Sequence, residues 1–304
     1  MKWINNTGWI GFVAMLVLLF TQGTRDENED KQYVQAFHNS YGIYAVPIPT
    51  DINLAGEKPP LNDPDVLERL DREMHVNTYW QSNSLLMFKR ASRYFPEIEP
   101  ILEKYGVPDD FKYLALIESG LTNVVSPSGA VGFWQIMKGT GEDYGLEINS
   151  EIDERYNVEK STEAACKYLL DAKAKFGNWT LAAASYNMGM NGLEKQLERQ
   201  EATGYYDILL NSETARYVFR IMAVKAIMED PGQYGFHFRE KDLYEPLATK
   251  TIVVDSAVSN FAAFARQFNI SYKTLKYHNP WLRQSYITNK ARTPYQIKIP
   301  AQEG

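Results

Sequence analysis

The stretch YLALIESGL, residues 113–121, decides the expected fold, because it places one carboxyl group within an otherwise apolar helix. Helical periodicity aligns positions i, i+3, i+4 and i+7 on a single inward-facing stripe, which consists of Phe111, Leu114, Ala115 and Glu118. Further apolar residues occupy the other faces, so we expect this helix to be buried almost all round. Gly120 is a typical residue to end it.

Glu118 is unusual in this setting, because an ionised carboxylate is costly in apolar surroundings. Desolvation and the negative end of the helix dipole both raise the pKa of a carboxyl group. A carboxyl that stays protonated near neutral pH can act as a general acid. The alternative is that Glu118 has no function and lies by accident at the end of a helix.

Helical patterns extend outward from this stretch and cover about residues 63–240, so the protein is expected to be mainly α. Asp63 is a predicted N-cap, with Pro64 at the first helical position. Ser161 and Ser212 are predicted to cap two later helices. The chain has no internal repeat of 20 to 50 residues, which disfavours a helical solenoid.

The period changes near residue 245. TKTIVVDS and TPYQIKIP alternate as strands do, whereas VSNFAAFARQFN and SYKTLKYHNP have helical patterns. This β-α-α-β order predicts a second, small domain over residues 245–304.

The N-terminal residues 1–24 predict an export signal or a membrane anchor. The apolar run from Gly8 to Phe20 is short for a transmembrane helix and suits the core of a signal peptide. No A-x-A-like cleavage site follows, so an uncleaved anchor stays open, and no lipobox cysteine follows that would attach a lipid. Residues 25–62 are predicted to be a polar linker and an extended, proline-containing lead-in.

Composition excludes several classes of function. The net charge of -6 argues against a nucleic-acid partner, because binding to phosphates needs a basic face. The single cysteine, Cys166, permits no intramolecular disulfide and is interpreted as a small buried thiol. None of the four histidines has a metal-ligating neighbour at a useful spacing, so we expect no metal and no cofactor.

Polar candidates for a binding site lie in three segments. Small residues follow Glu118 and form a loop that leads to Gln135, whose side chain can hydrogen-bond sugar hydroxyl and amide groups. Taken alone, that segment can also be a surface turn followed by a core helix. Tyr186 and Asn187 precede a glycine-rich turn and can be a helix C-cap only. Glu213 can simply complement a helix dipole, and Tyr217 can be core.

Taken together, three segments resemble the family 23 lytic transglycosylases, and within them the membrane-bound murein transglycosylase D type. The resemblance covers about residues 64–232 and rests on ALIESGLTNVVSPSGAVGFWQIMKGTGEDYGL, STEAACKYLLDAKAKFGNWTLAAASYNMGMNGLE and ETARYVFRIMAVKAI in the family's order. It implies a lysozyme-like, all-helical catalytic domain that acts on peptidoglycan glycan strands.

The resemblance also implies roles for individual residues. Glu118 matches the catalytic acid and base, and seven residues match substrate-binding positions: Ser126, Gln135, Met137, Tyr186, Asn187, Glu213 and Tyr217. The loop from Glu118 to Ser126 departs from the family, because it is one residue shorter than the common spacing and lacks the usual proline.

The reaction implied by the resemblance needs one carboxyl group. Most glycosidases use two, but Glu142 and Asp143 are interpreted as solvated helix residues. In the implied scheme, Glu118 first protonates the oxygen that leaves N-acetylmuramic acid. It then accepts the proton of that sugar's 6-hydroxyl, which attacks C1 and closes a 1,6-anhydro ring.

Residues from about 249 to 300 resemble a LysM module, which binds glycans that contain N-acetylglucosamine. Asn279 and Pro280 stand in the usual place after the second helix, but the typical glycine-aspartate turn after the first strand is missing. The alternative is a small packing module without a ligand.

Two other functions stay open for the whole chain. One is a non-catalytic peptidoglycan-binding or scaffold protein, and the other is a goose-type lysozyme that hydrolyses the same bond. In each case we expect an exported monomer in the periplasm or cell envelope, with a possible membrane tether at the N-terminus.

Overall fold

The computed structural model describes residues 30–33, 35 and 43–301. Residues 1–45 and residues 46–304 fall into two separate units. The segment predicted to direct export, residues 1–24, lies outside the described residues. Among the residues that are described, no helix combines the length and the apolar character that crossing a lipid bilayer requires.

The helical part begins where the sequence predicts it. Helix α2 spans Pro64–Tyr79, and the side chain of Asp63 caps it by accepting a hydrogen bond from the Asp65 amide. Helix α3 spans Gln81–Tyr105 and ends at Gly106, whose φ of 69° is a left-handed conformation that favours glycine.

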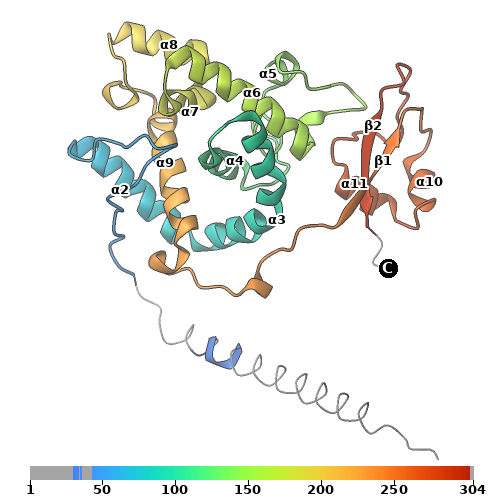
Figure 1. Cartoon of the computed structure of the whole chain (residues 1–304), viewed down its shortest axis with the longest axis horizontal. Coiled ribbons are helices and arrows are strands. Elements are labelled where there is room, and N and C mark those ends of the chain that lie inside the picture. The colour runs from blue at the N-terminus through green and yellow to red at the C-terminus, as the bar shows by residue number, and fades with distance from the viewer. Residues whose placement is uncertain (1–29, 34, 36–42, 302–304) are drawn as a thin grey trace, which may run out of the picture. The chain divides into compact units, whose positions relative to one another are not determined.

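Helix α4, Lys112–Ser119, contains the apolar stretch and follows a 3₁₀ turn at Asp109–Phe111. Leu114, Ala115 and Leu116 have no exposed surface. The helix contacts α3 and α9 (Ser212–Glu229), and Figure 1 shows it in the midst of the helical part. The prediction of a buried helix is therefore confirmed.

The remaining helices surround this core. They are α5 (Lys138–Asp143), α6 (Val158–Phe176), α7 (Trp179–Met188), α8 (Met190–Arg199) and α9, with short 3₁₀ turns at Glu154–Tyr156, Tyr205–Asp207, Pro231–Tyr234 and Glu240–Asp242. Cys166 is fully buried in α6, and burial raises the pKa of its thiol to about 12, as expected of a packing residue.

Two predicted N-caps are wrong. The Asn157 side chain caps α6 by accepting from the Lys160 amide, and Ser161 is buried one turn inside the helix. The Asn211 side chain caps α9 by accepting from two amides, and Ser212 is the first helical residue. In both cases an asparagine upstream of the serine is the N-cap, and because asparagine and serine cap helices about equally well, the residue types alone do not decide between them.

From residue 46 to residue 63 the lead-in contains turns and a short bridge between Leu54 and Glu57 but no helix, and it packs onto the helices. The carboxylate of Glu57 accepts hydrogen bonds from the backbone amides of Trp179 and Thr180, at 2.7 and 2.8 Å. These amides open helix α7, so a negative charge lies at the positive end of that helix dipole.

The C-terminal part has the predicted β-α-α-β order. Strands β1 (Thr249–Val254) and β2 (Tyr295–Pro300) pair antiparallel, with Ile252 opposite Ile297. Helices α10 (Phe261–Arg266) and α11 (Tyr272–His278) lie between them in the chain, and Phe261 and Leu275 are fully buried. The protein is mainly α with a small β-containing C-terminal domain, as the sequence predicts.

Truncation of the α4 core tests this packing. Leu114→Ala should reduce the free energy of unfolding by about 2–5 kcal/mol, because it removes buried methyl groups and leaves a cavity. The control Leu209→Ala, at a side chain that is 74% exposed, should change the free energy by less than about 0.5 kcal/mol. Chemical denaturation of both variants measures the difference, and equal values would contradict the assignment of α4 as core.

Candidate active site

Glu118 lies in the last turn of α4, at the end of the buried stripe. Phe111, Leu114 and Ala115 of that stripe are fully buried, whereas Glu118 keeps part of its surface accessible. The carboxyl group therefore lies at the boundary between the core and solvent.

Tyr217 of α9 is the hydrogen-bond partner of this carboxyl group. Its hydroxyl donates to Oε1 of Glu118, although the two residues are 99 positions apart in the chain. Tyr217 is 4% exposed, so it is a core residue and a partner of Glu118 at once. Burial and the Glu118 charge both raise the pKa of Tyr217, which keeps its proton available for donation.

The pKa of Glu118 is raised to about 6, and burial is the main cause. The charge of Glu213 raises it further, whereas the hydrogen bond from Tyr217 and the charge of Arg220 lower it. A group with this pKa can both donate and accept a proton close to neutral pH.

The loop that follows Glu118 is bonded to the end of α4. The Ser119 hydroxyl donates to the Phe133 carbonyl at 2.8 Å, which ties the loop to the helix. Gly132 has a φ of 80°, and a Cβ atom there would lie 2.1 Å from the Arg155 carbonyl oxygen, so only glycine fits. Gln135 adopts a left-handed φ of 46°, and its side-chain amide donates to the carbonyls of Val124 and Gly132.

Ser126 and Met137 have different surroundings. The Ser126 hydroxyl accepts from the Ala130 amide at 3.0 Å and closes a turn within the loop. Met137 is 46% exposed and precedes α5. The alternative of a surface turn followed by a core helix does not fit this segment, because the helix that follows, α5, buries only Gly141.

Tyr186 and Asn187 connect three parts of the site. The Tyr186 hydroxyl donates to the Trp134 carbonyl at 2.8 Å. The Asn187 side chain accepts from the Thr214 hydroxyl at 2.7 Å and donates to the Glu213 carboxylate at 3.2 Å. Because Gly189 is the residue that ends α7, the interpretation of this pair as a C-cap only is wrong.

A pocket of about 570 Å³ lies beside these residues. Its lining includes four predicted site residues and two tyrosines that were not predicted as site residues: Gln135, Met137, Tyr186 and Asn187, with Tyr144 and Tyr168. Glu118, Ser126, Glu213 and Tyr217 are not among its lining residues. Burial and, as a smaller contribution, the charge of Glu118 raise the pKa of the Tyr186 phenol, which lines the pocket.

Two signals could have identified the missed residues. Arg220 follows Glu213 and Tyr217 at helical positions i, i+4 and i+7, so it shares their face of α9. Tyr168 of α6 lines the pocket, and its hydroxyl donates to the Ser185 carbonyl. Amphipathic rings of this kind serve both a core and a ligand surface.

The two carboxyl groups of α5 that the sequence predicts to be solvated are exposed. Glu142 and Asp143 are exposed on α5, and Glu142 lies 3.7 Å from the Lys138 ammonium. Within residues 30–33, 35 and 43–301, His, Cys, Asp and Glu form no group of three that could hold a metal ion.

Comparison with known proteins identifies two regions of the chain. Residues 98–209 match the transglycosylase SLT domain, and residues 250–303 match the soluble lytic transglycosylase C-terminal LysM-like domain. The chain is 30% identical over 217 residues to the membrane-bound lytic murein transglycosylase D of Escherichia coli K12, which covers 69% of this chain and 47% of the relative. It is 26% identical over 143 residues to the membrane-bound lytic murein transglycosylase F of Cronobacter sakazakii, covering 42% of this chain and 26% of the relative.

Among solved structures, the chain is similar to the 70 kDa soluble lytic transglycosylase SLT70 of Escherichia coli, with a TM-score of 0.37 and 24% identity over 43% of this chain and 24% of the other. The complex of the 70 kDa soluble lytic transglycosylase with bulgecin A gives a TM-score of 0.42 and 20% identity. The match covers 58% of this chain and 33% of the other chain. The chain spans about half the length of the murein transglycosylase D relative. Residues 98–209 are therefore similar to the transglycosylase SLT domain, and residues 250–303 are similar to the C-terminal LysM-like domain of soluble lytic transglycosylases.

Proposed function

We propose that this protein is a lytic transglycosylase that cleaves peptidoglycan glycan strands between N-acetylmuramic acid and N-acetylglucosamine. The observation that carries the proposal is the Glu118 carboxyl, partly buried, with a pKa of about 6 and a phenol donor beside it. The relatives with which the chain aligns are named lytic murein transglycosylases. Murein is peptidoglycan, so the substrate class follows from those names.

In the first step, protonated Glu118 donates its proton to the glycosidic oxygen while the bond between that oxygen and C1 breaks. The carboxyl group becomes a carboxylate in this step. The Tyr217 hydroxyl stabilises the new charge by a hydrogen bond, and the positive charge of Arg220 does so through space. N-acetylglucosamine leaves with the transferred proton.

In the second step, the carboxylate of Glu118 accepts the proton of the 6-hydroxyl on N-acetylmuramic acid. The 6-oxygen bonds to C1, so a 1,6-anhydro ring forms and Glu118 is protonated again. No water is consumed, and the nucleophile belongs to the sugar that is already bound. A second carboxylate is not needed, which agrees with the solvated positions of Glu142 and Asp143.

The pocket beside Glu118 is suited to sugar rings. Tyr144 and Tyr168 present aromatic surface, and Met137 adds a flexible apolar side chain. Gln135 and Asn187 add polar groups that can orient hydroxyl and acetamido substituents. Ser126 and Glu213 act indirectly in this proposal, because one shapes the loop and the other holds Asn187.

Peptidoglycan lies outside the cytoplasmic membrane, so the proposed substrate places the protein in the cell envelope. The predicted export segment at residues 1–24 and the membrane-bound relatives support this location. We propose that the LysM-like domain binds the same glycan strands.

Removal of the acid tests the reaction. Glu118→Gln should fold normally and lose about 10²–10⁴-fold of the cleavage rate, because the amide cannot transfer a proton. Mass spectrometry of digested murein measures this loss and identifies the products. The control Glu142→Gln, at an exposed carboxyl on α5, should cleave at the wild-type rate.

The products of the wild-type protein separate the three functions. A transglycosylase releases products that lack one water, a goose-type hydrolase releases hydrated products, and a binding protein releases none. Near wild-type cleavage by Glu118→Gln would show that another group is the acid.

The pH profile tests the environment of Glu118. Because the acid must be protonated, kcat/KM should fall as pH rises through about 6. Tyr217→Phe removes a hydrogen bond that lowers the Glu118 pKa, so the fall in kcat/KM should occur at higher pH than in the wild type. The cleavage rate should also decrease by about 10- to 100-fold.

A matched variant controls for the loss of a buried phenol hydroxyl. Tyr205→Phe removes hydroxyl contacts to the backbone of Thr214 and Ala215, at the start of α9, without touching Glu118. Its pH profile should match that of the wild type. A Tyr217→Phe profile that shifts to lower pH would contradict the proposed role of the phenol.

A further inference from the structure

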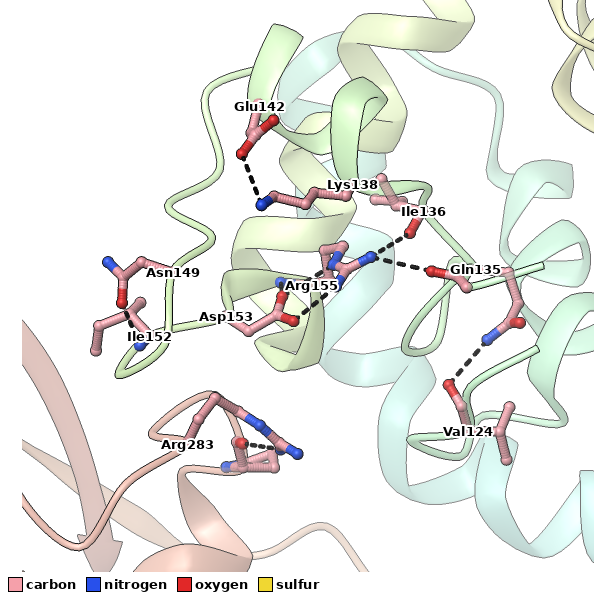
Figure 2. A network of polar contacts seen from close by, with 12 residues as sticks. Val124, Gln135, Ile136, Lys138, Glu142, Asn149, Ile152, Asp153, Arg155 and Arg283 are labelled. Carbon is pink, nitrogen blue, oxygen red and sulfur yellow. Dashed lines mark hydrogen bonds and ion pairs between the residues drawn. The ribbon is translucent and has the colours of Figure 1, made fainter. Parts of the chain in front are cut away.

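Arg155 lies in the segment 147–157, hereafter the bridging segment, and is 8% exposed. Its guanidinium donates to both carboxylate oxygens of Asp153, at 2.9 and 2.8 Å. The remaining nitrogen donates to the carbonyls of Gly129 and Ile136, at 3.2 and 3.3 Å, and Figure 2 shows this network. A planar guanidinium can hold this many acceptors at fixed angles, which an ammonium group cannot.

The two carbonyls belong to opposite arms of residues 124–137, hereafter the groove loop. Between the arms, Gly132 packs directly against the carbonyl oxygen of Arg155. The loop also contains Gln135 in a left-handed conformation, which costs a residue other than glycine about 1–3 kcal/mol and persists only when its surroundings hold it. Arg155 binds the carbonyl of the next residue, Ile136, so it is one of the contacts that restrain this conformation, together with the backbone bonds between Val131 and Ile136.

The groove loop in turn positions the site around Glu118. The Ser119 hydroxyl binds the Phe133 carbonyl, and the Tyr186 hydroxyl binds the Trp134 carbonyl. Gln135 and Met137 of the same loop line the pocket. A shift of this loop therefore moves the pocket wall relative to the carboxyl group.

On its other side, the bridging segment is bound by the C-terminal module, residues 249–301. The Asp153 amide donates to the Trp281 carbonyl at 2.9 Å, and the Arg283 amide donates to the Glu151 carbonyl at 2.7 Å. The Thr288 amide donates to the Glu151 carboxylate at 2.7 Å.

Two further contacts join the bridging segment to the module. The Tyr295 hydroxyl donates to the Glu147 carboxylate at 2.8 Å. The guanidinium of Arg283 lies over the ring of Tyr156, 4.0 Å from its centre. Asp153 is thus bonded to the module through its backbone and to Arg155 through its side chain.

An apolar core also joins the bridging segment to the C-terminal module. Ile152 and Tyr156 of the bridging segment are buried together with Trp281 and Leu282 of the module. Val131 of the groove loop, 4% exposed, belongs to this cluster as well. The groove loop, the bridging segment and the module therefore share one apolar core, in addition to the route through Arg155.

We propose that the C-terminal module sets the position of the groove loop, and that Arg155 is the positioning residue that transmits the restraint. The module then contributes to catalysis by holding the pocket wall, independently of any glycan that it binds itself. The kinetic consequence rests on the proposed function, whereas the mechanical coupling does not.

The experiment uses full-length variants at both ends of the connection. Arg155→Lys keeps the charge but cannot hold all four acceptors, and Glu151→Ala removes the bonds to Thr288 at a solvent-accessible seam. Hydrogen exchange of the amides at residues 129–136 reports the loop, and kcat and KM with soluble glycan strands report the site. Thermal unfolding shows whether each variant is folded.

Both variants should exchange faster at residues 129–136, by about 5-fold or more, while amides of α4 keep their protection. KM should rise by about 5-fold or more with a smaller change in kcat, because the loop contacts substrate and not the transferred proton. Glu151→Gln keeps an acceptor oxygen for Thr288. Its exchange rate at residues 129–136 and its KM should therefore lie close to the wild-type values.

The control is Asp242→Asn, which weakens another bidentate arginine–carboxylate pair, with Arg239, that shares no hydrogen bond with the loop. It should leave loop exchange and KM at their wild-type values. Wild-type loop exchange in folded Arg155→Lys and Glu151→Ala would overturn the coupling. If the wild-type protein cleaves no glycan, the proposed function fails, and the exchange measurement still decides the coupling.

Discussion

The desolvation of one carboxyl group at the end of a buried helix is the constraint around which the helical part is arranged. Helix α4 gives Glu118 little water, and its dipole opposes a negative charge there. A donor must then come from another element, and Tyr217 of α9 provides it. Helix α9 is also held by an ion pair, because Arg216 donates to the fully buried Glu73 of α2 at 2.6 Å.

Residues on one face of α9 therefore set the pKa of Glu118 by opposing effects. Tyr217 and Arg220 lower the pKa of the carboxyl group, whereas Glu213, one turn before Tyr217, raises it. Asn187 binds Glu213 and Thr214, so the position of α7 fixes the start of this face. Because burial outweighs the two stabilising groups, the carboxyl stays near a pKa of 6, where it can change protonation state in both directions.

Helical phase alone predicted the inward position of Glu118, because the stripe and its desolvation are local properties of the sequence. The partnership with Tyr217 spans 99 positions, so no local pattern contains it, and the prediction of Tyr186, Asn187 and Tyr217 as site residues came from the family resemblance. The helix starts were misplaced by one to four residues, since serine and asparagine are both good N-caps. Arg155 was missed because its acceptors come together only in the folded chain.

The C-terminal module shows why a boundary in the sequence need not be a boundary in the core. A two-stranded sheet is marginally stable by itself in water, so β1 and β2 depend on apolar partners. The apolar cluster of the module includes Val131, Ile152 and Tyr156, all of which lie before the domain boundary predicted at residue 245. Coupling between two sites is reciprocal. If the module holds the groove loop, the loop must stabilise the module by the same free energy, and a glycan that orders the pocket strengthens both.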